Sequence, residues 1–229
     1  MWKSTVAGRV LHFRLAGINN QNFLMTDRET GSWWQQVSGQ AIAGALRGQT
    51  LELAPYDELT FALWKMESPN GQVLAPVTKD AKQYESNWEP GVGKLPTVID
   101  FPGSGLASRD VVMGIEVNGS SRAYPLNKIL ANAPLQDRLG GEPIVLVAGP
   151  DGKSVRAFIS QSRGKDLELF RRSDSSWMLV DSLTGSEWNF RGCAVSGQAE
   201  GECLQAVPVL KDYWFDWRNY HPATSIFQR

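Results

Sequence analysis

Two aspartates begin matching motifs, and their type and setting could support chemistry. Asp27 begins the pattern Asp-x-x-Thr-Gly-Ser-x-Trp, and Asp181 begins the same pattern again. A pair of carboxylates across a cleft could do acid–base work if burial raised the pKa of one of them. The same pattern is typical of an Asx-type turn, in which the carboxylate accepts hydrogen bonds from loop N–H groups. The sequence favours the turn and leaves acid–base catalysis as the alternative.

His221 is the third candidate for catalysis. An imidazole titrates close to neutral pH, so this residue could act as a general base. It precedes Pro222 and follows a segment with helical spacing. A contact at the end of that helix is the favoured interpretation.

A polar segment rich in aromatic residues is the candidate ligand site. Asn20 and Asn22 stand in a polar turn, and Trp33, Trp34 and Gln36 follow shortly after it. Together they could line a polar pocket with aromatic walls, which would suit a small-molecule ligand. Because Asn tolerates left-handed backbone geometry, an ordinary loop is the alternative for the turn.

The two cysteines, Cys193 and Cys203, flank a glycine-containing turn. A cross-strand disulfide is expected if the compartment is oxidising, and two buried free thiols are the alternative. With two histidines in the chain and no suitable ligand spacing, we expect no metal site. We find no serine nucleophile elbow, phosphate loop or Rossmann fingerprint, and therefore expect no cofactor.

The overall charge excludes one class of partner. The chain has 23 basic and 24 acidic residues and a net charge of −1, whereas nucleic-acid binding depends on clustered Lys and Arg. No apolar run approaches the roughly 20 residues of a membrane helix. The first residues are polar, so we expect neither a membrane span nor a signal peptide in this chain.

The two aspartate motifs belong to a longer internal repeat. The second copy keeps the spacing of the first apart from one deletion, and the matched residues are mostly glycine, tryptophan and turn formers. The first copy contributes Asp27, Thr30, Gly31, Ser32, Trp34, Gly39, Gly44, Gly48 and Trp64, and the second repeats them as Asp181, Thr184, Gly185, Ser186, Trp188, Gly192, Gly197, Gly201 and Trp217. Since Gly tolerates positive φ, matched glycines predict matched backbone turns. The recurring tryptophans are interpreted as scaffold.

Most of the elements that position these residues are predicted to be strands. Alternating residues predict a strand over 9–15, and Asn118-Gly119 between two alternating runs predicts a hairpin. The apolar run over 144–147 is typical of a strand buried on both faces. Each copy is expected to end in a short helix, with Asp57 capping the first one.

These patterns predict a mainly β fold with short helices, built as two related β-rich units that pack together in a barrel-like or sandwich arrangement. The first unit covers residues 1–75 and the second covers 109–229. Residues 76–108 form a connector rich in Pro and Gly, in which regular elements are not expected. About 40 residues precede the matching strand of the second unit, whereas only residues 1–7 precede that of the first. We expect the first unit either to be truncated or to borrow structure from the second. A truncated unit should have an unpaired strand edge, which could support a homo-oligomer.

The chain resembles a prokaryotic family of unknown function, the domain-of-unknown-function family numbered three-one-seven-nine. The resemblance rests on the Asp-Thr-Trp and glycine series, on 123–125 (Ala-Tyr-Pro), on 137–143 (Asp-x-Leu-Gly-Gly-x-Pro) and on the closing Trp and His-Pro. It covers residues 110–227 well and 8–75 partly. Family members often carry Cys-Pro-Leu-Cys where this chain has Val-Ala-Gly-Pro at 147–150. Thiol or metal chemistry of such members is therefore not expected here.

Two functions remain open. The first is a non-catalytic binding or scaffolding module of the cell envelope, since the resemblance implies that related proteins are often exported. The second is a small enzyme that uses Asp27, Asp181 or His221 for acid–base chemistry in an aromatic-walled pocket. Two ionisable groups that converge in one pocket with shifted pKa values would favour the enzyme.

Overall fold

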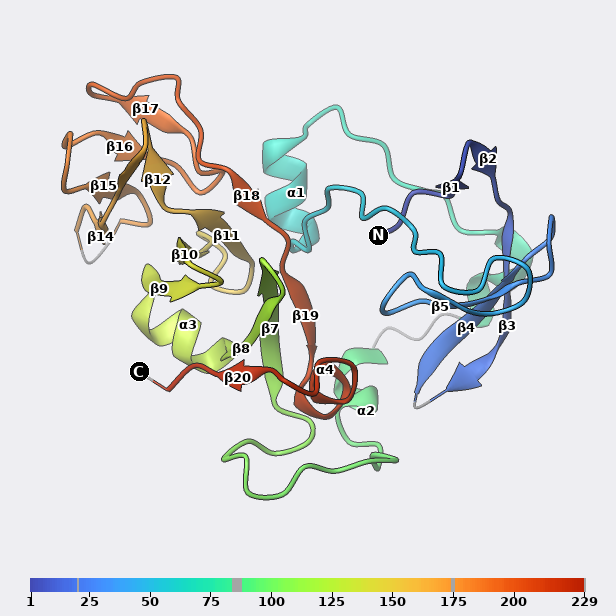
Figure 1. Cartoon of the computed structure of the whole chain (residues 1–229). Coiled ribbons are helices and arrows are strands. Elements are labelled where there is room, and N and C mark those ends of the chain that lie inside the picture. Colours follow the sequence, from blue (N-terminus) through green and yellow to red (C-terminus); the bar gives the residue numbers. More distant parts are fainter. Residues whose placement is uncertain (20, 84–87, 174–175, 229) are drawn as a thin grey trace.

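The computed structural model describes residues 1–19, 21–83, 88–173 and 176–228. Short strands form most of its regular structure and the helices are few and short, which confirms the mainly β fold with short helices. The sheets in these ranges are open, with no closed barrel among them. Figure 1 shows the β-sheets of residues 1–75 beside those of residues 109–229. We keep the names first unit and second unit for these two segments, as the division that the sequence predicts.

One four-stranded sheet of the second unit has the order β19-β7-β8-β20. Its strands are β7 (Val111–Val117), β8 (Ser120–Pro125), β19 (Leu210–Tyr213) and β20 (Ser225–Ile226). The predicted turn joins β7 to β8, with φ of 49° at Asn118 and 75° at Gly119. These left-handed values suit the Asn-Gly pair of a tight hairpin. Helix α4 (Trp214–Tyr220) packs its tryptophans on this sheet.

A second sheet, in the order β18-β11-β10-β9, forms the centre of the second unit. It contains β9 (Leu135–Leu139), β10 (Glu142–Ala148), β11 (Val155–Ile159) and β18 (Ala206–Val207). On one face, Ile144 and Leu146 join a cluster that includes residues of helix α3 (Leu126–Asn132). On the other face, Val145 and Val147 join a different buried cluster. Strand β10 is thus buried on both faces, as its continuous apolar run predicts.

Two further sheets contain the repeated motif and have the same topology. The first unit has β3 (Phe13–Asn19), β4 (Asn22–Asp27), β5 (Trp33–Gln35) and β6 (Ala41–Ala43) in sequential antiparallel order. The second unit has β14 (Leu169–Arg171), β15 (Leu179–Asp181), β16 (Glu187–Trp188) and β17 (Ala194–Ser196) in the same order. An irregularity in register occurs at Trp33/Trp34 and again at Glu187/Trp188. The two sheets therefore share this departure from regular pairing, whereas the shift between Leu15 and Gly17 occurs in the first sheet and has no counterpart between β14 and β15.

One repeated glycine shows why the spacing recurs. Gly44 has φ of 93° and Gly197 has φ of 88°. A Cβ atom at Gly44 would lie 2.6 Å from the Cα of Ser32, and one at Gly197 would lie 2.7 Å from the Cα of Ser186. Both the backbone angle and the close approach therefore require glycine at this point of each unit.

The remaining elements are short. They are β1 (Thr5–Val6), β2 (Arg9–Val10), β12 (Gln161–Ser162), β13 (Lys165–Asp166), α1 (Phe61–Glu67), the 3-10 helix η1 (Thr78–Gln83) and α2 (Trp88–Val92). Elements η1 and α2 lie in the connector, so the prediction that it lacks regular elements is wrong. Helix α2 includes Pro90, which a helix tolerates in its first turn, and η1 contains neither Pro nor Gly.

Helix α1 begins later than the sequence indicates. Its N-cap is Thr60, whose Oγ1 accepts a hydrogen bond from the N–H of Leu63 at 3.3 Å. The prediction that Asp57 caps this helix is therefore wrong, because that carboxylate lies before the cap and pairs with an arginine of the second unit. Figure 1 shows α1 beside β18 of the second unit, apart from the β3–β6 sheet of its own unit.

Candidate functional site

The carboxylate of Asp27 lies inside a turn at the end of β4. It is 2 % exposed and accepts the N–H of Thr30 at 2.5 Å, the hydroxyl of Thr30 at 2.8 Å and the indole N–H of Trp34 at 2.8 Å. Burial alone would raise the pKa of Asp27, but these hydrogen bonds outweigh it and keep the pKa below its usual value. The carboxylate is thus held ionised by the turn that it organises.

Asp181 repeats this arrangement at the end of β15. It accepts hydrogen bonds from the N–H of Thr184 at 2.5 Å, from the N–H of Leu183 at 2.9 Å and from the indole of Trp188 at 2.9 Å. Burial would raise its pKa as well, and the bonds from Trp188 and Thr184 lower it. Asp27 and Asp181 belong to different sheets, so each carboxylate serves its own turn.

His221 lies at the C-terminal end of α4 as its C-cap residue. Its ring stacks on the indole of Trp217, with centroids 3.6 Å apart, and its Nε2 lies 3.7 Å from a carboxylate oxygen of Glu116. Its Nδ1 lies 3.1 Å from the carbonyl oxygen of Trp217. These contacts place the imidazole at the end of the helix.

The residues of the expected ligand pocket lie in different surroundings. Trp34 is fully buried in the small core of the first unit, whereas Trp33 is 40 % exposed. The backbone carbonyl of Gln36 accepts the indole N–H of Trp2 at 2.6 Å. The side chain of Asn22 reaches the second unit. Asn20 lies outside the described residues, and none of the other four lines the large hollow described below.

The two cysteines are joined in the structure. Cys193 and Cys203 form a disulfide across a hairpin, at a position where the first unit pairs Gln40 with Thr50 through the same kind of isolated bridge. The hairpin thus takes the same form in both units with and without the bond.

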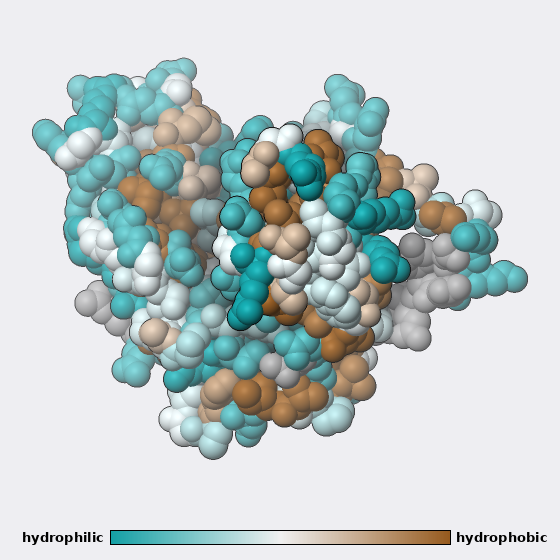
Figure 2. All heavy atoms as spheres, turned by 45° about the vertical axis from the view of Figure 1, so that its right-hand side comes forward, coloured by the Kyte–Doolittle hydropathy of each residue, from teal (hydrophilic) through white to brown (hydrophobic). Residues whose placement is uncertain are grey.

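A hollow of about 1050 Å³ lies at the junction of the two units, and we call it the inter-unit cleft. One wall is formed by 53–73 of the first unit, including α1, and the other by β11, β18 and the start of β19. Figure 2 brings the first unit forward and shows it standing in front of the second unit, which lies behind it to the left. The wall on α1 carries Phe61, which is 63 % exposed and stacks on Trp64 with ring centroids 5.5 Å apart.

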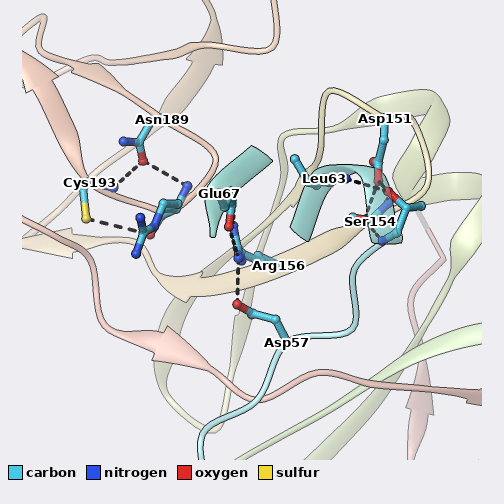
Figure 3. A network of polar contacts seen from close by, with 10 residues as sticks. Asp57, Leu63, Glu67, Asp151, Ser154, Arg156, Asn189 and Cys193 are labelled. Atoms are coloured by element: carbon cyan, nitrogen blue, oxygen red, sulfur yellow. Dashed lines mark hydrogen bonds and ion pairs between the residues drawn. The ribbon is translucent and has the colours of Figure 1, made fainter. Parts of the chain in front are cut away.

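A buried arginine holds the two walls of the cleft together. Arg156 on β11 bonds both carboxylate oxygens of Glu67 at 2.8 Å and a carboxylate oxygen of Asp57 at 2.7 Å. Its guanidinium also lies 4.6 Å from the ring centroid of Phe190. Figure 3 shows Arg156 between the two carboxylates, which come from the segments before and within α1. A bidentate pair of this kind fixes orientation as well as distance.

The N-terminus of α1 is tied to the second unit by further polar contacts. The hydroxyl of Thr60 donates to Asp151 at 2.6 Å, and its N–H donates to the hydroxyl of Ser154 at 3.1 Å. Burial would raise the pKa of Asp151, but the hydrogen bonds from Ser154 and Thr60 lower it to about 2. Leu63, which is 3 % exposed, packs in the second unit's buried cluster. Helix α1 therefore contributes Leu63 to the core of the second unit.

A second contact between the units is built from acids that the sequence analysis missed. Asp216 on α4 accepts the side-chain N–H of Asn22 at 2.5 Å, and its charge acts on Asp212 of β19. Burial, and then the charge of Asp216, raise the pKa of Asp212 to about 8. Burial also raises the pKa of Asp216.

The repeat contains the signal that could have found this pair. Asp212 and Asp216 stand where the first copy has Leu59 and Leu63, and both leucines pack into the second unit's core. An aspartate at each of two positions that are apolar in the other copy marks a changed environment. Only the fold shows that this environment is the tip of the β3–β4 hairpin.

The described part of the chain lacks both a metal-binding cluster and a membrane-spanning helix. None of its residues form a group of three or more His, Cys, Asp or Glu that could hold a metal ion. No helix within it has the length and apolar character needed to cross a bilayer.

Comparison with models of protein families matches residues 1–224 to the family described as "Protein of unknown function (DUF3179)". No curated protein matches the chain, and no solved structure matches it. The family description gives no ligand or reaction, so function has to be inferred from the geometry of the chain itself.

Proposed function

The chain belongs to the DUF3179 family of proteins of unknown function, and we propose that it is a non-catalytic binding module whose inter-unit cleft holds a small, partly apolar ligand. The observation that carries the proposal is the cleft itself, about 1050 Å³ in volume with an exposed aromatic ring on its wall. Small-molecule sites are typically concave, mostly apolar and equipped with a few fixed polar groups.

The chemistry of the walls favours a ligand of mixed character. One face of Phe61 stacks on Trp64, and its exposure leaves ring surface free for an apolar part of a ligand. Polar partners nearby include Lys211 and Glu58, which pair at 3.4 Å on the rim. Arg156 is fully engaged by two carboxylates, so it shapes the cleft and does not attract a free anion.

A location in the cell envelope forms part of the proposal. The disulfide between Cys193 and Cys203 supports it, because such bonds persist in oxidising compartments. A homo-oligomer through the exposed edge of β3 is a further proposal, since β3 ends its sheet. Light scattering of the purified chain would show its mass in solution.

The alternative function, an enzyme based on Asp27, Asp181 or His221, receives less support. Each aspartate is occupied by its own turn, and both carboxylates have lowered pKa values, the opposite of what a general acid needs at neutral pH. None of the three residues lines the inter-unit cleft.

The proposal is tested with 1-anilinonaphthalene-8-sulfonate, an amphipathic aromatic probe whose fluorescence increases in apolar sites. We expect saturable binding by the folded chain and at least fivefold weaker binding by Phe61→Ala. Because Phe61 is 63 % exposed, this substitution should leave folding intact. The matched control is Phe170→Ala, which removes a ring of similar exposure, 51 %, on β14 outside the cleft.

Two results would refute the proposal. One is the absence of saturable probe binding, and the other is equal affinity in Phe61→Ala and the unchanged chain. If the probe binds as expected, its displacement by candidate metabolites identifies the class of natural ligand.

A further inference from the structure

We propose that a second hollow, on the second unit, binds a carboxylate attached to a small apolar group. This hollow lies between helix α3, strand β10 and strands β14 and β15, and its volume is about 280 Å³. Its lining includes Leu130, Pro134, Val147, Arg171, Trp177 and Leu179, and we call it the Trp177 hollow. None of the described residues lines both this hollow and the inter-unit cleft, so the inference does not depend on the function proposed for that cleft.

Most of the wall of the Trp177 hollow is apolar. Leu130 comes from α3, Val147 from β10 and Leu179 from β15. Trp177 adds an indole ring that is 43 % exposed. A cavity of roughly 150 Å³ can hold a benzene ring, so about 280 Å³ is sufficient for one ring and a carboxylate. Apolar walls with a few polar groups are typical of small-molecule sites.

The polar side chains of the lining can all donate hydrogen bonds. They belong to Arg171, Ser176 and Trp177, and no Asp or Glu stands among the described lining residues. The oxygen of the Ser176 hydroxyl accepts the N–H of Met178 at 3.1 Å, which leaves its O–H to donate. An ionised carboxylate accepts hydrogen bonds and donates none. The lining therefore favours a carboxylate over an amine or another cation.

Arg171 is held in place by one nitrogen and keeps the other two for a ligand. Its Nε donates to the carbonyl oxygen of Ala133 at 2.7 Å, and Ala133 also lines the hollow as the C-cap residue of α3. Within the described residues, neither the two Nη atoms of Arg171 nor the indole N–H of Trp177 has a hydrogen-bond partner. A guanidinium binds a carboxylate through two parallel N–H bonds, which gives orientation as well as affinity.

The internal repeat shows that the fold of the sheet does not require these two donors. Trp177 stands four residues before the aspartate of its copy, where the first copy has Phe23. Arg171 pairs across the sheet with the residue two places before that aspartate, and Leu15 takes this pairing position in the first copy. The first unit thus forms the same sheet without either donor. Both donors are additions of the second unit, at the point where the hollow lies.

The test is a titration with benzoate, followed by the NMR signals of the indole N–H groups in the nitrogen-15-labelled chain. The signal of Trp177 is identified by its loss in Trp177→Phe. We expect it to shift saturably with benzoate. Benzamide has the same shape without the charge, so we expect it to bind about tenfold more weakly, because a charge-assisted hydrogen bond is stronger than a neutral one.

Two pairs of variants separate the site from general effects on the fold. Arg171→Gln keeps an N–H donor but loses the charge, so benzoate should bind about tenfold more weakly and benzamide about as before. The control is Arg172→Gln, which alters the neighbouring exposed arginine that pairs with Glu187 and should leave both affinities unchanged. Trp33→Phe is the control for the indole, because Trp33 has a similar exposure, 40 %, and lies on β5 of the first unit.

The source of the carboxylate is distinguished with N-acetylphenylalanine, which resembles the C-terminus of a peptide. Tighter binding than that of benzoate identifies a peptide end, and weaker binding identifies a free acid; both results support the site.

The proposal is overturned if the Trp177 signal does not shift saturably, if benzamide binds as tightly as benzoate, or if Arg171→Gln keeps the full preference for benzoate. Should Arg171→Gln fail to fold, the comparison of benzoate with benzamide in the unchanged chain decides the matter. The Phe61→Ala variant should bind benzoate at the Trp177 hollow as the unchanged chain does, because Phe61 lines the inter-unit cleft. Failure of one site is therefore distinguishable from failure of the other.

Discussion

Replacement of Leu63 by Ala tests whether helix α1 of the first unit belongs to the core of the second. The Leu63 side chain is 3 % exposed and packs among residues of β10, β11 and β14. The substitution removes three buried carbons, worth about 0.8 kcal/mol each in transfer free energy. A residual cavity adds to this loss, so we expect the free energy of unfolding to fall by about 3 kcal/mol.

The assay is equilibrium unfolding in urea followed by tryptophan fluorescence, where such a loss lowers the midpoint by roughly 1 M. Met66→Ala is the matched control, because Met66 lies on the same helix but is 71 % exposed. It should change the free energy of unfolding by less than about 0.5 kcal/mol. If the two variants lose the same stability, Leu63 is not buried in the second unit and the docking of α1 is refuted.

Three further predictions concern the repeated turns, a close helix contact and the disulfide. Asp27→Asn and Asp181→Asn should each lower the free energy of unfolding by about 2–3 kcal/mol, because an amide cannot accept every hydrogen bond that the carboxylate accepts. Since both carboxylates have lowered pKa values, their stabilisation is present above pH 3.8 and is lost as the pH falls below it, which acid titration by circular dichroism would show. Gly114→Ala should cost more than about 3 kcal/mol or prevent folding, because its Cβ would lie 2.2 Å from an indole carbon. Reduction of Cys193 and Cys203 should cost about 2–3 kcal/mol without unfolding the chain, and thiol titration should find no free thiol before reduction.

The repeated turns could be predicted from the sequence because their chemistry is local. In Asp-x-x-Thr-Gly, the carboxylate and the donors that it satisfies are separated by three residues. Gly44 and Gly197 occupy matching positions in the two copies, which predicts a turn with positive φ at each, and both glycines adopt it. Asn118-Gly119 predicted its hairpin for the same reason. Such features depend on a few adjacent residues and are little affected by the rest of the fold.

The contacts between the units could not be predicted, because their partners are far apart in the sequence. Arg156 and Glu67 are separated by 89 residues, and Asn22 and Asp216 by 194. An arginine in a strand pattern reads as a solvent-exposed position until a fold places carboxylates above it. The sequence predicts Asn22 as a polar turn residue that could contact a ligand, whereas in the structure its amide donates to Asp216 of the second unit.

The inter-unit cleft could not be predicted from the sequence either. Its exposed aromatic ring, Phe61, stands where the other copy has Trp214, and that match does not indicate a ligand site. Phe61 is a candidate for ligand contact because β11 and β18 form the opposite wall of the inter-unit cleft. That wall faces Phe61 only because α1 docks on the second unit. The sequence therefore predicts the repeated unit, whereas the site depends on how the two copies meet.

The most direct test of the account is a double-mutant cycle on Arg156 and Glu67, made with Arg156→Met and Glu67→Gln and measured by urea unfolding. These side chains are 9 % and 17 % exposed and form a bidentate pair, so we predict a coupling energy of about 2 kcal/mol. An exposed pair such as Arg163 and Glu202 should give less than about 1 kcal/mol. A coupling energy near zero for Arg156 and Glu67 would contradict the account, because α1 would then not lie against β11 in solution.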